Sequence, residues 1–513
     1  MRICLFDGYI RNQAQLCEEL RVQPSCPQDA EHEILEAAYA RWGHNIGNHL
    51  FGSFALVIHD EERDELFCTR DPLGLKPFYY RHDPDGTFCY GSNIGDVIRE
   101  GRTREGIDRE ALQHYLMLGY PAGEKTLYAG VKKLTPGHYL VFDGKECHVE
   151  AYYSLTFEPD FSRTEEQWVH DVEQTLKDIL ADDAEALESG GSCSFLSGGV
   201  DSSYLLALSG ARHAYGIGYD EGERSEAPLA AQTASGLGVE FLETKVASDM
   251  FFDAIPRLVH AAGLPTADAS TVALLLGCER VVRDGTCCLS GEGADELFAG
   301  YHIYRRAAEL GHTGGPWHFG CSGVMDQNAA QSLLGLEHPY PAEDLVKGIY
   351  KATESWEHLS RLQAIDCALW LEGDILLGAN AASQASGLKL LLPYADRRMV
   401  DLACRIPAEF RIKGDCNKYV LRKAAQNHLP PEIAFRPKVG FSVPICTWMR
   451  EEDRREGIES MLFGSNASLL FDVNQIRRYW NSFLNGNDVL WKILYAIYVF
   501  LVWYRDCFLR GSE

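Results

Sequence analysis

The fold of this chain is decided by residues 197–203, Ser-Gly-Gly-Val-Asp-Ser-Ser. They follow a short apolar run at residues 194–196 and precede the helix-like run Tyr-Leu-Leu-Ala-Leu at residues 204–208. Glycines let backbone N–H groups approach an anion without interference from a Cβ atom, and serine hydroxyls and a helix N-terminus add donors and a favourable dipole. A serine-rich helix cap is the alternative interpretation. The strand, the glycine turn, the internal aspartate and the paired serines together favour a loop that binds phosphate groups.

The residue types within this loop narrow the kind of phosphate site. Walker-type loops end in Gly-Lys-Ser or Gly-Lys-Thr, and residues 197–203 contain no lysine. A lysine-free loop with an internal aspartate is typical of enzymes that split ATP between its α and β phosphates. We therefore expect a pyrophosphate loop, and ATP as the nucleotide.

A second glycine-rich stretch, Ser-Gly-Glu-Gly-Ala-Asp-Glu at residues 290–296, follows the strand-like residues 286–289. Ligands of a parallel sheet bind at the carboxyl ends of its strands, so the two loops are expected to face one crevice. Asp201 and Asp295 would then lie near one polyphosphate, and because they would repel it, they are predicted to bind Mg²⁺. Glu292 is left as a candidate acid–base group. A glycine turn with solvated acids is the alternative for this stretch alone.

Two later motifs contain cations. Residues 417–422, Asn-Lys-Tyr-Val-Leu-Arg, open a helix, and residues 436–444, Arg-Pro-Lys-Val-Gly-Phe-Ser-Val-Pro, form a loop with two basic side chains. Lys418 is predicted to stabilise charge on the α-phosphate or on an acyl-adenylate. For any single lysine the alternative is a solvated surface position.

The chain divides by pattern into two parts. Residues 1–155 are rich in strands, with helices expected at 31–42 and 108–118, which indicates an α+β domain. Residues 165–513 alternate strands (193–196, 214–219, 286–290) with helical stretches and become mostly helical after about residue 355, which indicates an α/β domain with a parallel sheet. Residues 311–335 are irregular and glycine-rich, and we expect an exposed loop there.

Composition excludes several classes of protein. The 513 residues carry a formal net charge of −26, which gives no general reason to bind nucleic acid or an anionic membrane. The apolar run at residues 489–504 contains Lys492 and is short for a membrane span, so a buried terminal helix is expected. The 16 cysteines include no Cys-x-x-Cys pair, which favours reduced thiols in the cytoplasm and argues against a structural zinc site.

Taken in order, the motifs resemble those of the asparagine synthetase family. The resemblance rests on the two loops, on Leu-Pro-Tyr-Ala-Asp at residues 392–396, and on the two basic motifs, and it covers essentially the whole chain. It implies a glutamine amidotransferase domain of the Ntn-hydrolase type at residues 1–155, incomplete here. It also implies a PP-loop ATP pyrophosphatase domain at residues 165–513 with a helical C-terminal part.

In that family a carboxylate attacks the α-phosphate of ATP, pyrophosphate leaves, and ammonia or an amine captures the acyl-adenylate as an amide. The resemblance implies an ATP-dependent, AMP-forming carbon–nitrogen ligase, and a homodimer. It assigns Glu292 to amide formation, Lys418 to charge stabilisation and Asp201 with Asp295 to Mg²⁺. The nucleotide would be bound by the two loops and by residues 214–218, that is by Ser197, Gly198, Gly199, Asp201, Ser202, Ser203, Gly216, Ser290 and Gly291.

The first domain departs from the family's pattern. Glutamine-hydrolysing members begin Met-Cys-Gly, whereas this sequence begins Met-Arg-Ile-Cys, and Cys4 does not match the nucleophile. Asp7 and Tyr9 stand where the family has the oxyanion-hole Asn and the glutamine-binding Glu. An ionised Asp cannot donate a hydrogen bond and Tyr offers no charge, so no glutamine hydrolysis is expected.

The second domain departs at residues 378–381, which read Gly-Ala-Asn-Ala where many members have Lys-Val-Asp-Arg. The loss of these charges puts aspartate in doubt as the acyl substrate. Three functions stay open: an asparagine-type ligase using free ammonia, an amide-closing enzyme similar to β-lactam synthetases and lasso-peptide cyclases, and a catalytically silent paralogue. β-Lactam synthetases carry Tyr where this chain has Glu292, which favours the first function.

Overall fold

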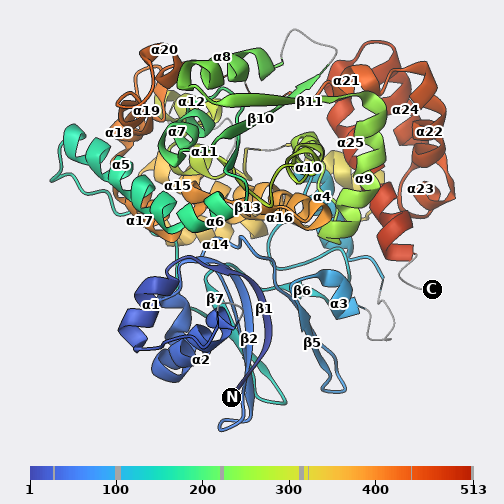
Figure 1. The fold of residues 1–513 in the computed structure, drawn as a ribbon. Coiled ribbons are helices and arrows are strands. Elements are labelled where there is room, and N and C mark those ends of the chain that lie inside the picture. The colour runs from blue at the N-terminus through green and yellow to red at the C-terminus, as the bar shows by residue number, and fades with distance from the viewer. Residues whose placement is uncertain are drawn as a thin grey trace.

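The computed structural model describes residues 1–26, 29–98, 106–219, 225–310, 317–321, 323–438, 440 and 442–509. Figure 1 shows a smaller body formed by the first strands and helices, which lies against one side of a larger, mostly helical body. The smaller body contains antiparallel sheets, and the larger one contains the parallel sheet that the sequence predicts.

The main sheet of the smaller body has the order β1-β2-β3-β7-β8, with antiparallel neighbours throughout. Side chains alternate between its two faces along β2: Phe54 and Leu56 pack under helices α1 and α2, whereas Ala55 and Val57 face the opposite side. The bounds are Arg2–Ile10 (β1), Gln13–Leu20 (α1), Ala30–Trp42 (α2), Gly52–Asp60 (β2), Glu65–Arg70 (β3), His138–Phe142 (β7) and Cys147–Ala151 (β8).

A second antiparallel sheet, β5-β4-β6, consists of Phe88–Gly91, Tyr79–His82 and Lys132–Lys133. Helix α4 (Arg109–Leu118) belongs to the same part of the sequence but packs into the larger body. Its Tyr115 is fully buried and donates a hydrogen bond of 2.9 Å to the carbonyl of Ala496. The core of the larger body therefore includes residues that precede the expected boundary at residue 155.

The parallel sheet of the larger body has the order β11-β10-β9-β12-β13. Its strands are Glu240–Val246, His213–Tyr219, Cys193–Phe195, Cys287–Leu289 and Lys389–Leu391. The strand order reverses between β9 and β12, because β9 is followed by β10 on one side and β12 lies on the other. Crevices form at such a reversal, outside the carboxyl ends of the strands, and the loops after β9 and β12 both start there.

Helices cover both faces of this sheet (Figure 1). Phe195 and Tyr215 pack with α9 and α10, whereas Leu196 and Ala214 pack with α7 and α8. The helices used below are α7 (Val200–Ser209), α8 (Ala227–Leu237), α9 (Ser248–Ala262), α10 (Ala269–Val281), α11 (Ala294–Leu297), α12 (His302–Leu310), α15 (His358–Asp366), the π-helical η3 (Cys367–Leu376), α16 (Leu377–Ser386), α17 (Arg397–Arg405) and α19 (Tyr419–Ala425).

Two expectations about the later chain have opposite outcomes. Most of the apolar run at 489–504 forms helix α25 (Trp491–Trp503), which is buried as predicted. Within the described ranges, no helix has the length and hydrophobicity to span a bilayer. The expected loop at 311–335 is wrong in its last part, because helix α13 (Gln327–Leu334) forms there between the N-cap Asp326 and the left-handed Gly335. Residues 311–316 and 322 lie outside the described residues.

Candidate active site

The phosphate loop connects β9 to α7, as the sequence predicts. Gly198 has φ +81°, and a Cβ atom there would lie 2.9 Å from the backbone nitrogen of Ala230, so the turn requires glycine. Ser202 Oγ accepts a hydrogen bond of 3.2 Å from the N–H of Ser197, which holds the turn closed over the first residues of α7. The loop therefore presents backbone N–H groups at the start of a helix, as an anion site requires.

The second loop, between β12 and α11, lies directly against the first. A Cβ atom at Gly291 would be 3.4 Å from Cβ of Asp201, and Gly293 has φ +92° and forms the N-cap of α11. Asp295, in the first turn of α11, is thereby directed toward Asp201. The structure brings together the two carboxylates that the sequence analysis paired.

Lys418 joins these carboxylates. Its Nζ lies 2.6 Å from Asp201 Oδ2 and 2.8 Å from Asp295 Oδ1, and the residue is only 2 % exposed. Lys418 precedes α19 in the left-handed conformation, with φ 55° and ψ 34°, which is uncommon for a residue with a Cβ atom. This backbone conformation is the kind of local strain that is retained where a side chain must be aimed at a site.

Lys438 approaches Asp295 from the other side, with Nζ 2.7 Å from Oδ1 and 4.3 Å from the centre of the Tyr301 ring. Burial opposes ionisation of Asp295, but Lys418 and Lys438 hold the pKa of this carboxyl well below its usual range. Gly300 makes the close approach possible, since a Cβ atom there would lie 1.9 Å from Asp295 Oδ1 and 2.1 Å from Lys418 Cε.

A cavity of about 260 Å³ opens beside these charges. Of the residues predicted from the sequence, the ones that line it are Ser197, Gly199, Asp201, Ser202, Ser290, Gly291, Glu292, Asp295 and Lys418. Three predicted residues do not line it: Gly198 lies in the turn behind, Ser203 is fully buried, and Gly216 packs its α-carbon against the ring of Phe241. The neighbours of Gly216 in β10, Tyr215 and Ile217, line the cavity instead.

Glu292 is a cavity carboxyl whose pKa suits proton transfer at neutral pH. Burial, reinforced by the nearby carboxylates of Asp295 and Asp268, raises its pKa to about 7. Ser290 Oγ lies 3.4 Å from Glu292 Oε1 and stabilises the ionised form slightly. A carboxyl group with this pKa is present in both protonation states at neutral pH, so it can accept a proton and return it.

The sequence analysis missed several residues of the cavity. Glu226 and Asp268 line it, and burial raises the pKa of both, that of Glu226 to about 7. Arg436 donates a hydrogen bond of 2.8 Å to the carbonyl of Gly198 and so braces the phosphate loop. The basic loop at 436–444 was the available signal for Arg436. An isolated Glu and an Asp that caps a helix gave no comparable signal for the other two.

A second cavity, of about 560 Å³, lies between the smaller body and the β13 region of the larger one. Asp7 forms an ion pair of 2.9 Å with Lys76, which itself lines this cavity. Tyr9 accepts a hydrogen bond of 2.7 Å from Arg11, and burial raises its pKa above the ordinary value. Glu31 accepts hydrogen bonds from the N–H of Ile10 and the amide of Gln13. Asp7, Tyr9 and Glu31 therefore each already have a polar partner in this part of the structure.

Comparisons with known proteins agree with this arrangement. The chain matches the asparagine synthase family over residues 172–505 and the glutamine amidotransferase domain over residues 2–153. It is 28% identical to the "Putative asparagine synthetase (glutamine-hydrolyzing)" of Mycobacterium tuberculosis, over 98% of this chain and 84% of that protein. It is 26% identical to "Asparagine synthetase (glutamine-hydrolyzing) 1" of Bacillus subtilis, over 98% and 85%.

Among solved structures, the glutamine-dependent NAD⁺ synthetase of Acinetobacter baumannii matches 69% of this chain and 88% of its own, with 12% identity and a TM-score of 0.22. A similarity this weak does not establish a shared fold. The family match, in contrast, spans more than half of the chain and includes both glycine loops and the lysine that joins their aspartates. The chain belongs to the asparagine synthase family of ATP-dependent carbon–nitrogen ligases.

Proposed function

We propose that the protein adenylates a carboxylic acid with ATP and transfers the acyl group to ammonia or an amine, releasing AMP and pyrophosphate. The observation that carries this proposal is the joint position of Asp201, Asp295 and Lys418 at one end of a cavity that also contains Glu292. The phosphate loop would bind the pyrophosphate part of ATP. The apolar side chains of Leu196 and Ile217 would contact the adenine base.

The residues present fit a magnesium ion. Asp201 Oδ1 is buried and has no hydrogen-bond partner among the described residues, so one carboxylate oxygen is left for a ligand. Hard oxygen donors from two carboxylates are the ligands that Mg²⁺ takes when it also binds phosphates. Asp201 and Asp295 would hold the ion, which supplies neutralisation of the triphosphate charge.

The chain's own groups then divide the work. Contacts with the carboxylates of Asp201 and Asp295 raise the pKa of Lys418 although burial opposes its charge, so the lysine stays charged. It would stabilise negative charge as the substrate carboxylate attacks the α-phosphorus and pyrophosphate leaves. In the second half-reaction the amine nitrogen attacks the acyl carbon and AMP departs. Glu292 would accept the proton that the amine loses, which its pKa of about 7 permits.

The acyl substrate is proposed to be neutral or cationic beyond its reacting carboxylate. Among the residues that the structure describes, four basic side chains line the cavity, and three contact the loop end: Lys418 and Lys438 pair with its carboxylates, and Arg436 binds Gly198. The fourth, Arg422, donates to backbone carbonyls that include Asn417 and Ala434. The cavity lining also includes Asp268, Ser270 and Thr271.

Residues 378–381 reinforce this point. They lie in α16, where a Cβ atom at Gly378 would be 2.6 Å from Thr271 Oγ1, and Ala381 is fully buried. None of these four residues is basic and none lines the cavity, so these positions offer no positive charge to a substrate. This favours the second candidate, an amide-closing enzyme whose substrate brings its own amine, over aspartate amidation.

A panel of acids tests the proposal. The wild-type protein is incubated with ATP, Mg²⁺ and single carboxylic acids, with and without ammonia, and AMP is quantified. We expect AMP release with at least one acid, and release without ammonia for an acid that carries an internal amine. Release with aspartate and ammonia alone would overturn the substrate assignment, and no AMP with any acid would support a silent paralogue.

The smaller body is proposed not to hydrolyse glutamine. Asp7 is bound to Lys76 and offers no amide donor to an oxyanion, and the Tyr9 hydroxyl is engaged by Arg11. Glutamate release from glutamine is the direct measurement. We expect it to be absent under conditions in which ammonia or an amine supports product formation, and glutamine-driven product formation would contradict the assignment.

A further inference from the structure

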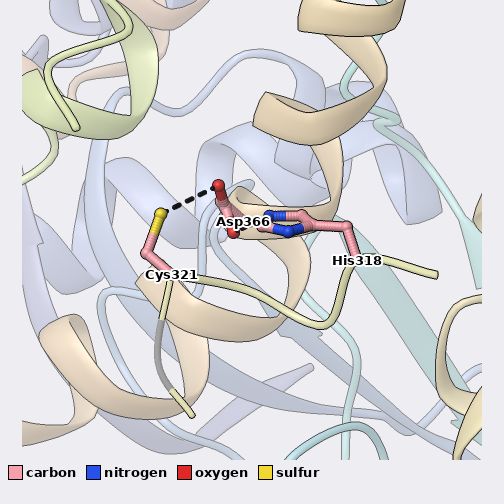
Figure 2. A group of neighbouring side chains, drawn as sticks. All are labelled: His318, Cys321 and Asp366. Atoms are coloured by element: carbon pink, nitrogen blue, oxygen red, sulfur yellow. Dashed lines mark hydrogen bonds and ion pairs between the residues drawn. The ribbon is translucent and has the colours of Figure 1, made fainter. Parts of the chain in front are cut away.

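A cluster of three potential metal ligands lies outside the cavity described above. His318 Nε2 is 2.8 Å from Asp366 Oδ1, and Cys321 Sγ is 3.3 Å from Asp366 Oδ2. Figure 2 shows the three side chains converging from the 317–321 segment and from the end of α15. One ligand atom from each residue falls within 4.8 Å of the others. Over the described part of the chain, this is the one such group of three.

We propose that His318, Cys321 and Asp366 bind a divalent transition metal of the zinc type. Imidazole nitrogen, thiolate sulfur and carboxylate oxygen form a donor set that such ions take in proteins, whereas Mg²⁺ prefers oxygen alone. The inference does not depend on the proposed ligase reaction, because none of the three residues lines the ATP cavity.

The distances are close to those of a tetrahedral site. Bond lengths of about 2.0–2.3 Å set ligand separations of roughly 3.3–3.5 Å around a tetrahedral zinc ion. The sulfur–oxygen separation of 3.3 Å already satisfies this, and the nitrogen–oxygen separation of 2.8 Å needs to open by about half an ångström. His318 and Cys321 thus each face a different oxygen of the Asp366 carboxylate.

The backbone of the 317–321 segment is shaped to aim both ligands at Asp366. Gly320, between His318 and Cys321, has φ +108°, a conformation that a residue with a Cβ atom rarely adopts. A Cβ atom there would lie 3.0 Å from the Tyr120 hydroxyl and 3.6 Å from Asp366 Oδ1. The N–H of His318 donates a hydrogen bond of 2.9 Å to the hydroxyl of Tyr350, which fixes the start of the segment.

Burial and charge also fit a metal. Asp366 is fully buried and His318 is 3 % exposed, whereas Cys321 is partly exposed. A thiolate and a carboxylate neutralise a divalent cation, so the buried group would carry no net charge. Tyr304 donates a hydrogen bond to Asp366 Oδ2, the kind of outer contact that orients a carboxylate ligand.

The sequence analysis argued against a structural zinc site because no Cys-x-x-Cys pair is present. The spacing His-x-x-Cys at residues 318–321 is the local signal that it passed over. The third ligand comes from a distant helix and could be found only from the fold. The site lies behind the cavity wall: Tyr304 contacts the ring of Tyr301, which lies under Lys438.

Cobalt substitution tests the proposal on the full-length chain. Chelator-treated protein is titrated with Co²⁺ in excess Mg²⁺, so that the ATP site is not counted, and thiolate-to-cobalt charge transfer is read in the near ultraviolet. Cys321→Ser keeps a hydroxyl donor to Asp366 and should fold. Cys416→Ser, at another partly exposed free cysteine, is the matched control. A second ligand variant is His318→Asn.

We expect one equivalent of Co²⁺ with a charge-transfer band in the wild type and in C416S. The band should vanish in C321S, and affinity should fall on the order of tenfold or more in H318N. Zinc measured in protein purified without chelator or affinity tag should follow the same order. A wild type that develops no band, or a C321S variant that retains it, would overturn the site and leave the cluster as a hydrogen-bonded clasp.

Discussion

Asp201 and Asp295 share one cation: Oδ2 of the first and Oδ1 of the second lie 2.6 and 2.8 Å from Nζ of Lys418. The two carboxylates come from loops that follow different strands of the parallel sheet, and the lysine precedes α19 much later in the chain. Lys418 therefore keeps two like charges together at the place where we propose that a metal–triphosphate complex binds. The predictions below follow from this arrangement and from the contacts that support it.

Replacing Glu292 by Gln should separate the two half-reactions. The amide-forming rate of the wild type should rise with pH around a midpoint near 7, because the ionised carboxylate accepts the proton of the amine. E292Q should lower this rate by a factor on the order of 10²–10⁴ and should abolish the rising limb of its pH profile, while ATP–pyrophosphate exchange is retained.

Glu296 provides the control for this pH profile. Burial and the Asp295 charge raise its pKa to about 7 as well, but its side chain accepts from the Tyr301 hydroxyl and does not line the cavity. E296Q should keep the rising limb. If E296Q abolishes the limb and E292Q preserves it, Glu292 is not the acid–base group.

The Glu292 carboxyl should lower the free energy of unfolding at neutral and alkaline pH. The unfolded chain loses the Glu292 proton near pH 4.5, whereas the folded protein holds it until about pH 7. The folded state is thus disfavoured progressively between these values, by on the order of 3 kcal/mol above pH 7. E292Q should raise the thermal unfolding midpoint at pH 8 and leave it nearly unchanged at pH 4. Equal shifts at both pH values would contradict this explanation.

Gly300→Ala should impair the site without disturbing the rest of the fold. The added methyl group would overlap Asp295 Oδ1 and Lys418 Cε, so the carboxylate and the lysine must move apart. We expect pyrophosphate exchange to fall at least tenfold, on the scale of a lost transition-state contact. Gly236→Ala, where nothing lies within 4 Å of the new Cβ, should exchange at the wild-type rate.

The two bodies are joined by a buried ionic contact that should be costly to break. Glu372 of η3 pairs with Arg70 at 2.9 Å and with Lys133 at 2.5 Å, and all three are at most 4 % exposed. Glu372→Ala leaves two cations unpaired, and we expect a loss of about 3–5 kcal/mol. Urea unfolding measures this.

Glu279→Ala removes the partner of Arg257 in a pair that is exposed at the surface. It should cost no more than about 1 kcal/mol. If the two glutamate variants unfold at the same urea concentration, the contact between the bodies does not stabilise the fold.

Much of the fold is readable from the sequence, and the exceptions have physical causes. β9 and β12 are short apolar runs that lead into the glycine-rich loops at 197–199 and 290–293, and β10 is a mostly apolar run, so their pattern is clear. β11 mixes charged and apolar residues without regular alternation at an edge of the sheet, and β13 has only three residues after the helix-ending Gly387, so neither gives a strong signal. Helix α4 has an ordinary amphipathic pattern, which cannot tell which body it will join.

The candidate site shows the same division. The two loops are found from their glycine turns, and Lys418 is found from the motif at residues 417–422 together with the family resemblance. Glu226 and Asp268 reach the cavity only through tertiary packing, and Gly216 is displaced from it because side chains alternate along β10. The expected homodimer and cytoplasmic location stay predictions.

Carboxylate-dependent ATP–pyrophosphate exchange is the most direct measurement of the central claim. With Mg²⁺ and an acid that supports AMP release, wild-type protein should exchange labelled pyrophosphate into ATP. Lys418→Met should lower that rate by a factor on the order of 10²–10³. Lys423→Met, which replaces a half-buried lysine in the helix that follows Lys418, should leave the rate unchanged. Cleavage of ATP to ADP and phosphate, or a K418M variant that exchanges as fast as the wild type, would contradict the account.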